Sequence, residues 1–185
     1  METMECIRSR RSIRQFTEQT ISDEVIQKLL EAVRWAPSWA NSQTWEVVVV
    51  KDPETRKKLV DATSVNRGSQ AIIEAAAVMV FCSRQGVSGT KEGVYATSKG
   101  DWSMFDCALA CQNFCLAANS RGLGTLYIGR FNHQQVDAIL GLPAGIESVV
   151  IIPVGFAAKV PKAPPRKSLA EFVHLDRFGN SYTDQ

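Results

Sequence analysis

The sequence lacks any long run of apolar residues. No stretch approaches the roughly 20 residues that a membrane-spanning helix needs, and the opening METMECIRSR has no apolar centre of the kind found in signal peptides. These two absences predict a soluble protein that is not exported and has no membrane partner.

A large excess of charge of either sign is also absent. The 21 lysines and arginines nearly balance the 19 aspartates and glutamates, which leaves a formal net charge of +2 at pH 7. This small charge argues against a general nucleic-acid binder, because such proteins carry a marked basic excess. No nucleic-acid partner is expected, and any basic character is local.

Histidines and paired cysteine motifs are scarce. The 2 histidines, His133 and His174, are isolated, which favours surface or capping roles over metal ligation or general-base catalysis. The 5 cysteines are odd in number and lack the short paired spacings of secreted scaffolds. We therefore expect free thiols in a reducing compartment and predict a cytoplasmic protein.

Three of the cysteines fall on one helical stripe. Cys107, Cys111 and Cys115 follow one another at steps of four residues. A metal or iron–sulfur site is one interpretation, but tetrahedral sites need four ligands and the sequence offers no partner pair. Packing as small apolar side chains is the favoured interpretation, and no metal is predicted.

The apolar residues that are present suffice for one core. The chain has 185 residues, of which 45% are hydrophobic, and this length is too short for two independent domains to be expected. We predict a single domain over residues 1–185, without internal repeats.

Helices and strands alternate along the chain. Ser22 predicts the start of a helix that Pro37 stops, and Asn132 and Gly141 predict the limits of another helix. Strands are predicted at 46–52, 75–82, 125–129 and 148–156. This alternation is typical of α/β or α+β proteins.

Three further segments carry distinct patterns. Residues 102–119 are apolar on nearly every side, which predicts a helix enclosed by neighbours or by a partner subunit, with Ala110 as a position that meets the partner. The polar stretch 83–100 predicts a mobile loop of the kind that often carries function. The proline-rich tail 159–175 predicts a rigid, extended arm.

The basic residues concentrate near the N-terminus, in RSRRSIRQF at residues 8–16. If the chain is extended there after a short first helix, Arg10, Ser12 and Arg14 share one face, because strand side chains alternate. Two guanidinium groups and a hydroxyl suit a phosphomonoester, which arginine can bind through two parallel hydrogen bonds. A solvated basic turn is the alternative for this segment taken alone.

A second segment offers hydrogen-bonding groups beside an aromatic side chain. In APSWANSQTW, residues 36–45, Asn41 and Gln43 precede Trp45, which leads into a strand. Such a loop suits a flat heterocycle. The glycines of RGLGT, by contrast, lie between a helix and a strand, the reverse of the order in a dinucleotide fingerprint, so a helix cap and a tight turn are favoured.

Four segments, in order, resemble the nitroreductase family of flavin enzymes. They are RRSIRQF, APSWANSQTW, QNFCLAANSRGLGTLYIG and, in the tail, PRKSLAEFV. The resemblance covers almost the whole chain. It implies an α+β fold with a central, mostly antiparallel mixed sheet flanked by helices, a long buried central helix and an extended C-terminal arm. It also implies a homodimer with flavin sites at the interface.

The resemblance assigns residues to FMN, segment by segment. Arg10, Arg11, Ser12 and Arg14 are expected to bind the phosphate, the ribityl chain and one edge of the ring. Arg166 and Lys167, in the tail, are expected to contact the phosphate as well. A loop of the neighbouring subunit supplies Pro37, Ser38, Trp39, Asn41 and Gln43, and a strand end facing the isoalloxazine supplies Leu126, Tyr127, Ile128 and Gly129. Asn66 and Arg67 match a family position at the polar edge of the ring.

Two positions depart from the family pattern. Trp39 stands where a small residue is usual, and Thr44 replaces a common proline. Both replacements are expected to narrow the space over the flavin.

The chemistry implied by the resemblance belongs to the cofactor. We expect an NAD(P)H-dependent FMN oxidoreductase that reduces a nitroaromatic, a quinone or a similar flat acceptor by a ping-pong mechanism, because both substrates would use the same face of the flavin. No catalytic side chain is predicted, and Arg14 is the candidate for stabilising the reduced flavin. The alternatives are a flavin-binding protein with little turnover, such as a sensor or FMN carrier, or a same-fold enzyme for dehydrogenation or dehalogenation.

Overall fold

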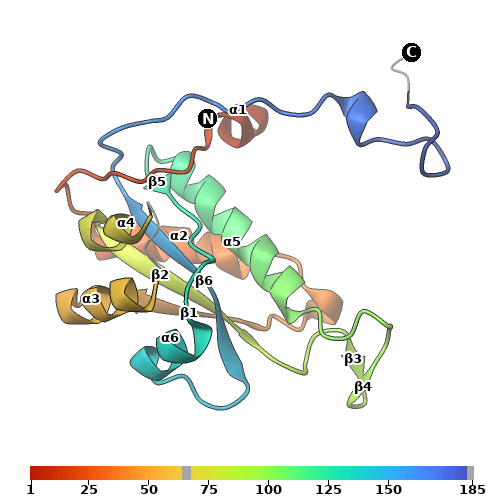
Figure 1. Ribbon diagram of the computed structural model, residues 1–185, viewed down its shortest axis with the longest axis horizontal. Helices are drawn as coiled ribbons and strands as arrows, with labels where there is room; N and C mark the ends of the chain where they lie inside the picture. The colour runs from red at the N-terminus through yellow and green to blue at the C-terminus, as the bar shows by residue number, and fades with distance from the viewer. Residues whose placement is uncertain (64–67, 183–185) are drawn as a thin grey trace.

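A four-stranded antiparallel sheet forms the centre of the molecule (Figure 1). The computed structural model describes residues 1–63 and 68–182. In sheet order the strands are β1 (Trp45–Val50), β2 (Ala77–Arg84), β6 (Ile146–Gly155) and β5 (Gly124–Thr125). An isolated parallel bridge joins Ser12 to Thr125, so the predicted mixed, mostly antiparallel sheet is confirmed.

Helices cover both faces of this sheet. One face is covered by α2 (Asp23–Arg34) and α5 (Ser103–Asn119), the other by α3 (Pro53–Ala62), α4 (Ser69–Glu74) and α6 (His133–Leu140). Strand side chains alternate between faces. Met79 and Phe81 of β2 therefore enter the core with α2 and α5, whereas Val78 and Val80 enter the core with α3, α4 and α6. This double burial explains the continuous apolar run of β2 and confirms the predicted α+β class.

Short polar contacts fix the helix limits that the sequence predicted. Ser22 Oγ accepts a hydrogen bond from Val25 N at 3.4 Å, and Asn132 Oδ1 accepts one from Gln135 N at 3.1 Å. Gly141 ends α6 with a φ of 65°, a left-handed conformation that favours glycine. The start of α2 and both limits of α6 are thereby confirmed.

The long helix α5 buries one face and exposes another. Met104 and Phe105 are 67% and 55% exposed. Ala110 is fully buried in the core beneath the helix. The expectation that Ala110 meets a partner is therefore wrong, because this residue faces the sheet of its own chain.

All 5 cysteines are free and buried. The three on α5 belong to the core shared with α2 and β2, as the apolar-packing interpretation predicted. Within the described ranges, no group of three or more histidine, cysteine or acidic side chains is arranged to hold a metal ion.

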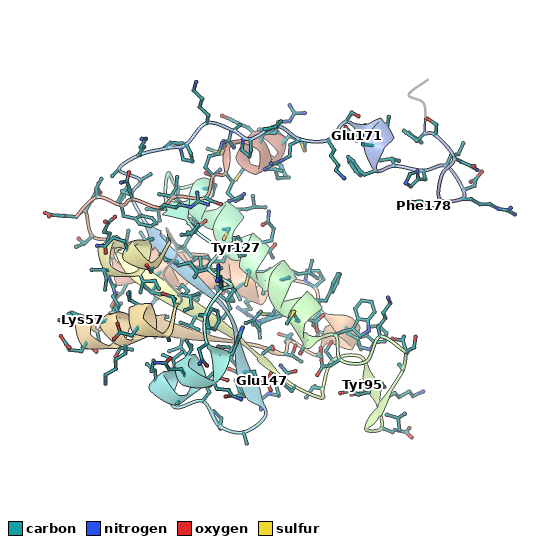
Figure 2. All side chains as sticks on the ribbon, viewed as in Figure 1. Lys57, Tyr95, Tyr127, Glu147, Glu171 and Phe178 are labelled. Atoms are coloured by element: carbon teal, nitrogen blue, oxygen red, sulfur yellow. The ribbon has the colours of Figure 1, made fainter. Side chains whose placement is uncertain are left out.

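The tail leaves the body as an extended arm. Nearly every residue from Ala158 onward is exposed, and a single short 3-10 helix, η2 (Leu169–Glu171), interrupts the described part of the arm. The arm passes α1 (Thr3–Ser9) and continues beyond it (Figure 1). Phe178, which is 92% exposed, lies far from the sheet (Figure 2). The arm therefore has the extended form that its prolines predicted.

Two segments differ from the prediction. The polar stretch 83–100, expected to be a loop, contains a hairpin of β3 (Thr90–Lys91) and β4 (Val94–Tyr95). The strand expected at 125–129 is shorter, because Ile128 pairs with β6 only through an isolated bridge.

In the described part of the chain, no helix has both the length and the apolar character that crossing a bilayer requires.

Candidate functional site

The basic segment is held in an extended form beside β5. Ile13 N donates to Thr125 O at 2.9 Å, and the Ile13 side chain is buried. A Cβ at Gly124 would lie 2.4 Å from Ile13 Cγ1, so this close approach requires glycine. With Ile13 turned inward, Ser12 and Arg14 lie on the opposite face, as alternation predicts.

A cleft of about 330 Å³ lies between this segment and the arm. It is lined by Arg10, Arg11, Ser12, Arg14, Pro161, Lys162, Pro164 and Arg166. Of these described lining residues, five are cationic and none is acidic. Two distant parts of the chain thus share one positively charged cleft, which suits a phosphate group.

Arg10 lines this cleft, and its charge lies near Cys115 and Tyr127. Its Nη1 atom is buried and has no hydrogen-bond partner among the described residues. Burial raises the pKa of both Cys115 and Tyr127, and the nearby charge of Arg10 opposes the rise in each. A buried cationic donor without an acceptor is costly, so an anion that reached Arg10 would be bound favourably.

Two further clefts meet the first at Arg14. One of about 520 Å³ is lined by Arg14, Gly68, Leu126, Tyr127, Ile128, Gly129 and Arg130. The other, of about 530 Å³, is lined by Ser12, Arg14, Gln15, Gln70, Glu74, Lys159 and Pro161. Because Arg14 lines all three clefts, its cation lies at their junction.

Residues 126–129, after β5, run alongside β6, and every second residue forms a backbone hydrogen bond with it. Leu126 and Ile128 are buried, and the Ile128 amide donates to a carbonyl of β6 at 2.9 Å. Alternation directs the amides of Tyr127 and Gly129 away from β6. The Tyr127 hydroxyl lies 3.4 Å from Gln112 Oε1 of α5, and Figure 2 shows the ring beside this helix.

The loop that precedes β1 forms a separate, mostly apolar cleft of about 310 Å³. The loop contains the 3-10 turn η1 (Trp39–Asn41), between Pro37 and Gln43. The ring centroids of Trp39 and Trp102 are 5.3 Å apart, and Phe105 lines the same cleft. Asn41 and Gln43, the amide residues that the sequence singled out, belong to the same loop but do not line this described cleft.

Within a single chain, this loop does not reach the basic cleft. The loop meets α5 in its first turn, where Trp39 N donates to Asp106 Oδ1 at 3.0 Å. Helix α1, which leads into the basic segment, meets the far end of α5, where Asn119 Nδ2 donates to Cys6 O at 2.9 Å. An α-helix rises about 1.5 Å per residue, so Asp106 and Asn119 lie about 20 Å apart along the axis.

Some predicted residues lie outside the clefts. Lys167 is exposed on the arm and does not line the described basic cleft. Asn66 and Arg67 lie outside the residues that the structure describes. Lys162 lines the basic cleft although no motif singled it out, and its place in the run PKAPPRK is the signal that could have identified it.

Comparison with known proteins identifies the family. The model of the nitroreductase family matches residues 7–156. The chain belongs to the nitroreductase family. This result confirms the resemblance carried by the four sequence segments.

Similar nitroreductase-family proteins match over most of their length. A Vibrio harveyi relative named NADPH-flavin oxidoreductase is 34% identical, with 95% of this chain and 74% of the relative covered. A Bacillus subtilis relative named FMN reductase (NADPH) is 31% identical, with 98% and 76% covered. A solved B. subtilis nitroreductase structure has a TM-score of 0.82 at 26% identity, with 96% of this chain and 75% of that chain covered.

Proposed function

We propose that this nitroreductase-family protein is an NAD(P)H-dependent FMN oxidoreductase. The observation that carries the proposal is the basic cleft, where Arg10 and Arg166, from distant parts of the chain, line one space. The names of the relatives support it, since one is an NADPH-flavin oxidoreductase and another an FMN reductase (NADPH).

The basic cleft fits the phosphate of FMN. Arg10 offers a buried Nη1 atom that has no partner among the described residues. We assign the phosphate to Arg10 and Arg166, with Ser12 as a further donor. A guanidinium group can bind a phosphate through two parallel hydrogen bonds. We assign the isoalloxazine to the neighbouring cleft along residues 126–129, since Arg14 lines both spaces.

When bound, FMN supplies hydride acceptance and electron transfer, which amino-acid side chains do not provide. The chain itself contributes position and charge. In this proposal Arg14 presents its cation to the edge of the ring where reduction places negative charge. Nitroaromatics, quinones or similar flat acceptors would use the same face of the flavin as the nicotinamide, one after the other, so ping-pong kinetics are expected.

We also propose a homodimer in which the Ser38–Gln43 loop of one subunit completes the cleft of the other. The separation of this loop from the basic cleft along α5 supports this arrangement. Apolar side chains left in solvent support it as well, namely Met104 and Phe105 on α5 and Phe178 on the arm.

The remaining parts of the proposal concern the whole chain. We propose one flavin-binding domain over residues 1–185, since the basic cleft joins residues 10–14 to residues 161–166. We also propose that the protein acts in the cytoplasm. The 5 buried free thiols support a reducing compartment.

Anaerobic absorbance spectroscopy tests the function. The purified protein, supplied with FMN, should retain it through gel filtration, and its flavin absorbance should bleach on addition of NADH or NADPH. A nitroaromatic or a quinone should then restore the colour without oxygen. The matched control is an Arg10→Ala/Arg166→Ala variant, which should lose the flavin while keeping its circular dichroism.

Each other result counts against part of the proposal. Failure of the wild-type protein to retain FMN would contradict the flavin site itself. Retained FMN that neither nicotinamide bleaches would instead favour the sensor or carrier alternative. Bleaching without reoxidation by either acceptor would point to another redox reaction on the same fold.

A further inference from the structure

Asp106 is a buried carboxylate for which the proposed chemistry has no use. It lies in the first turn of α5 and is 1% exposed. No ion pair within the described ranges includes it. A buried carboxylate without a cation must be compensated by hydrogen-bond donors, so the donors around Asp106 show what it holds in place.

Those donors come mainly from the loop before β1. Oδ1 accepts from Trp39 N at 3.0 Å. Oδ2 accepts from Ser42 Oγ at 3.1 Å and, over a longer distance of 3.5 Å, from Thr44 Oγ1. One carboxylate therefore holds both the beginning and the end of the loop against α5.

A further donor comes from the base of the β3–β4 hairpin. Ser88 Oγ donates to Asp106 Oδ2 at 2.6 Å, and Ser88 is fully buried. Ser88 O in turn accepts from Trp102 N at 3.2 Å. A Cβ at Gly89 would lie 2.5 Å from Trp102 Cδ1, so the hairpin packs tightly against this indole. Asp106 thus joins the segments that carry Trp39 and Trp102.

The loop needs such an anchor because its backbone is unfavourable. Ala40, Asn41 and Gln43 have φ values of 45°, 58° and 48°. Residues with a side chain seldom adopt this left-handed region, and they keep it only where the surroundings fix it. Inside the loop, Ser38 Oγ accepts from Gln43 N at 3.0 Å, and the hydrogen bonds to Asp106 fix the loop from outside.

We propose that Asp106 is a positioning residue that holds the Ser38–Thr44 loop, and with it the Trp39–Trp102 pair, in the single arrangement presented to the flavin site. The role in the site rests on the proposed function, whereas the role in holding the loop does not. Asp106 acts through Trp39, Asn41 and Gln43 and does not itself take part in the reaction. Its carboxylate serves as an acceptor shared by two loops.

Three variants and a matched control test this role. Asp106→Leu removes every acceptor while keeping the branched shape of the side chain. Asp106→Asn keeps one acceptor for Trp39 N, and the serine hydroxyls can turn to accept from its amide. The control is Asp137→Leu. Asp137 lies on α6, away from the loop, and its Oδ1 atom also accepts a backbone hydrogen bond, from Ser148 N at 2.9 Å. Should Asp106→Leu fail to fold, Ser42→Ala/Thr44→Val removes donors of the loop instead.

Two measurements need no flavin. Amide hydrogen exchange over residues 39–44 should accelerate about tenfold or more in Asp106→Leu, the size expected for loss of one hydrogen bond to a charged group. The near-ultraviolet circular dichroism of the two indoles should fall as well. Asp106→Asn should retain most of both signals, and Asp137→Leu should leave both unchanged while lowering the melting temperature.

A third measurement uses the FMN-loaded protein. The acceptor KM should rise in Asp106→Leu by a larger factor than kcat falls, because the aromatic surface is displaced while the cofactor stays bound. Wild-type exchange and dichroism in Asp106→Leu, or in the double variant where that one does not fold, would overturn the proposal. Equal changes in Asp137→Leu at matched loss of stability would overturn it too. A wild-type protein that takes up no FMN would contradict the proposed function, and exchange and dichroism would still decide whether Asp106 holds the loop.

Discussion

At the scale of single residues, the arginines differ in the hydrogen-bond partners of their guanidinium groups. Arg34 is an exposed partner of Glu31 at 3.1 Å, with 71% of its side chain in solvent. Arg56 donates to two backbone carbonyls at 2.6 and 3.0 Å. Arg10 has a buried Nη1 atom without a partner among the described residues. Arg56 Nε is likewise buried without a partner among the described residues, so Arg10 is distinguished by its place in the lining of the basic cleft.

Removal of the Arg10 side chain should weaken flavin binding. Arg10→Ala should cost about 1.5–3 kcal/mol of binding free energy, the usual value for a hydrogen bond to a charged group. Arg34→Ala is the control and should bind FMN as the wild type does, because its surface ion pair contributes little. Quenching of flavin fluorescence on titration gives both affinities. Wild-type affinity in Arg10→Ala would place the phosphate elsewhere.

The buried thiol of Cys82 should make stability depend on alkaline pH. Burial, followed by the neighbouring Cys107, raises the pKa of Cys82 from 9.0 to about 12. The unfolded chain releases this proton first, so the contribution of the neutral thiol is full below pH 9.0 and is lost as the pH rises toward 12. Urea midpoints measured across this range should fall, and they should fall less in Cys82→Ala. Equal slopes for both proteins would show that Cys82 is not the cause.

Prediction from sequence succeeded for residues whose arrangement depends on one short segment of the chain. Arg10, Ser12 and Arg14, which alternation predicted to share one face, all line the basic cleft, and Arg11 lines it as well. The role of Asp106 could not be read, because its donors lie about 20 to 70 positions away along the chain. In a sequence, an acidic residue within a helical pattern looks the same whether its side chain faces water or four hydrogen-bond donors of the protein.

At the scale of elements, α5 combines one buried and one exposed apolar face. Because the helix is apolar nearly all round, the sequence could not indicate which face belongs to the core. The structure places Ala110 in the core and leaves Ala108 exposed beside Met104 and Phe105. Two alanines separated by a single residue thus probe opposite sides of one helix.

A charge at each of these alanines should have a different effect. Ala108→Glu should leave the secondary structure intact and prevent dimerisation, because it puts a carboxylate on the exposed apolar face. Ala110→Glu should lower the melting temperature sharply, because it buries an unpaired charge. Light scattering and thermal circular dichroism separate the two outcomes. If the Ala108→Glu variant were still a dimer, the exposed face of α5 would not lie at the centre of the interface.

Elements with local signals were predicted and those without were not. The strands of the sheet, α2 and α6 have apolar periodicity or capping residues within their own sequence. Helix α4 was missed, because Gly68, which precedes it, has no capping side chain and six residues make too few turns to show a period. The β3–β4 hairpin was missed because two-residue strands are fixed by their surroundings.

At the scale of the whole molecule, the proposed flavin site is divided between two ends of α5. The basic cleft lies toward one end and the Ser38–Gln43 loop at the other. A partner subunit related by a two-fold axis would bring each loop to the opposite cleft. Folding, association and flavin binding should then be linked.

Added FMN should therefore stabilise the dimer by mass action. At free FMN about 100-fold above the dissociation constant, the expected stabilisation is about 2.7 kcal/mol per site. The melting temperature should rise with FMN and also with protein concentration, because association contributes to stability. Scanning calorimetry over a wide range of protein concentration measures both trends. A monomer that holds stoichiometric FMN in light scattering would contradict the divided site.

The basic cleft also sets a time order for synthesis of the protein. Its two walls, Arg10 and Arg166, are 156 positions apart in the sequence. At about 5–20 residues per second, the ribosome adds the second wall about 8–30 s after the first. The sheet, whose last strand ends at Gly155, precedes the arm. In the proposed site, capture of the cofactor would therefore await synthesis of the chain through Arg166, and FMN would not serve as a template for the early steps of folding.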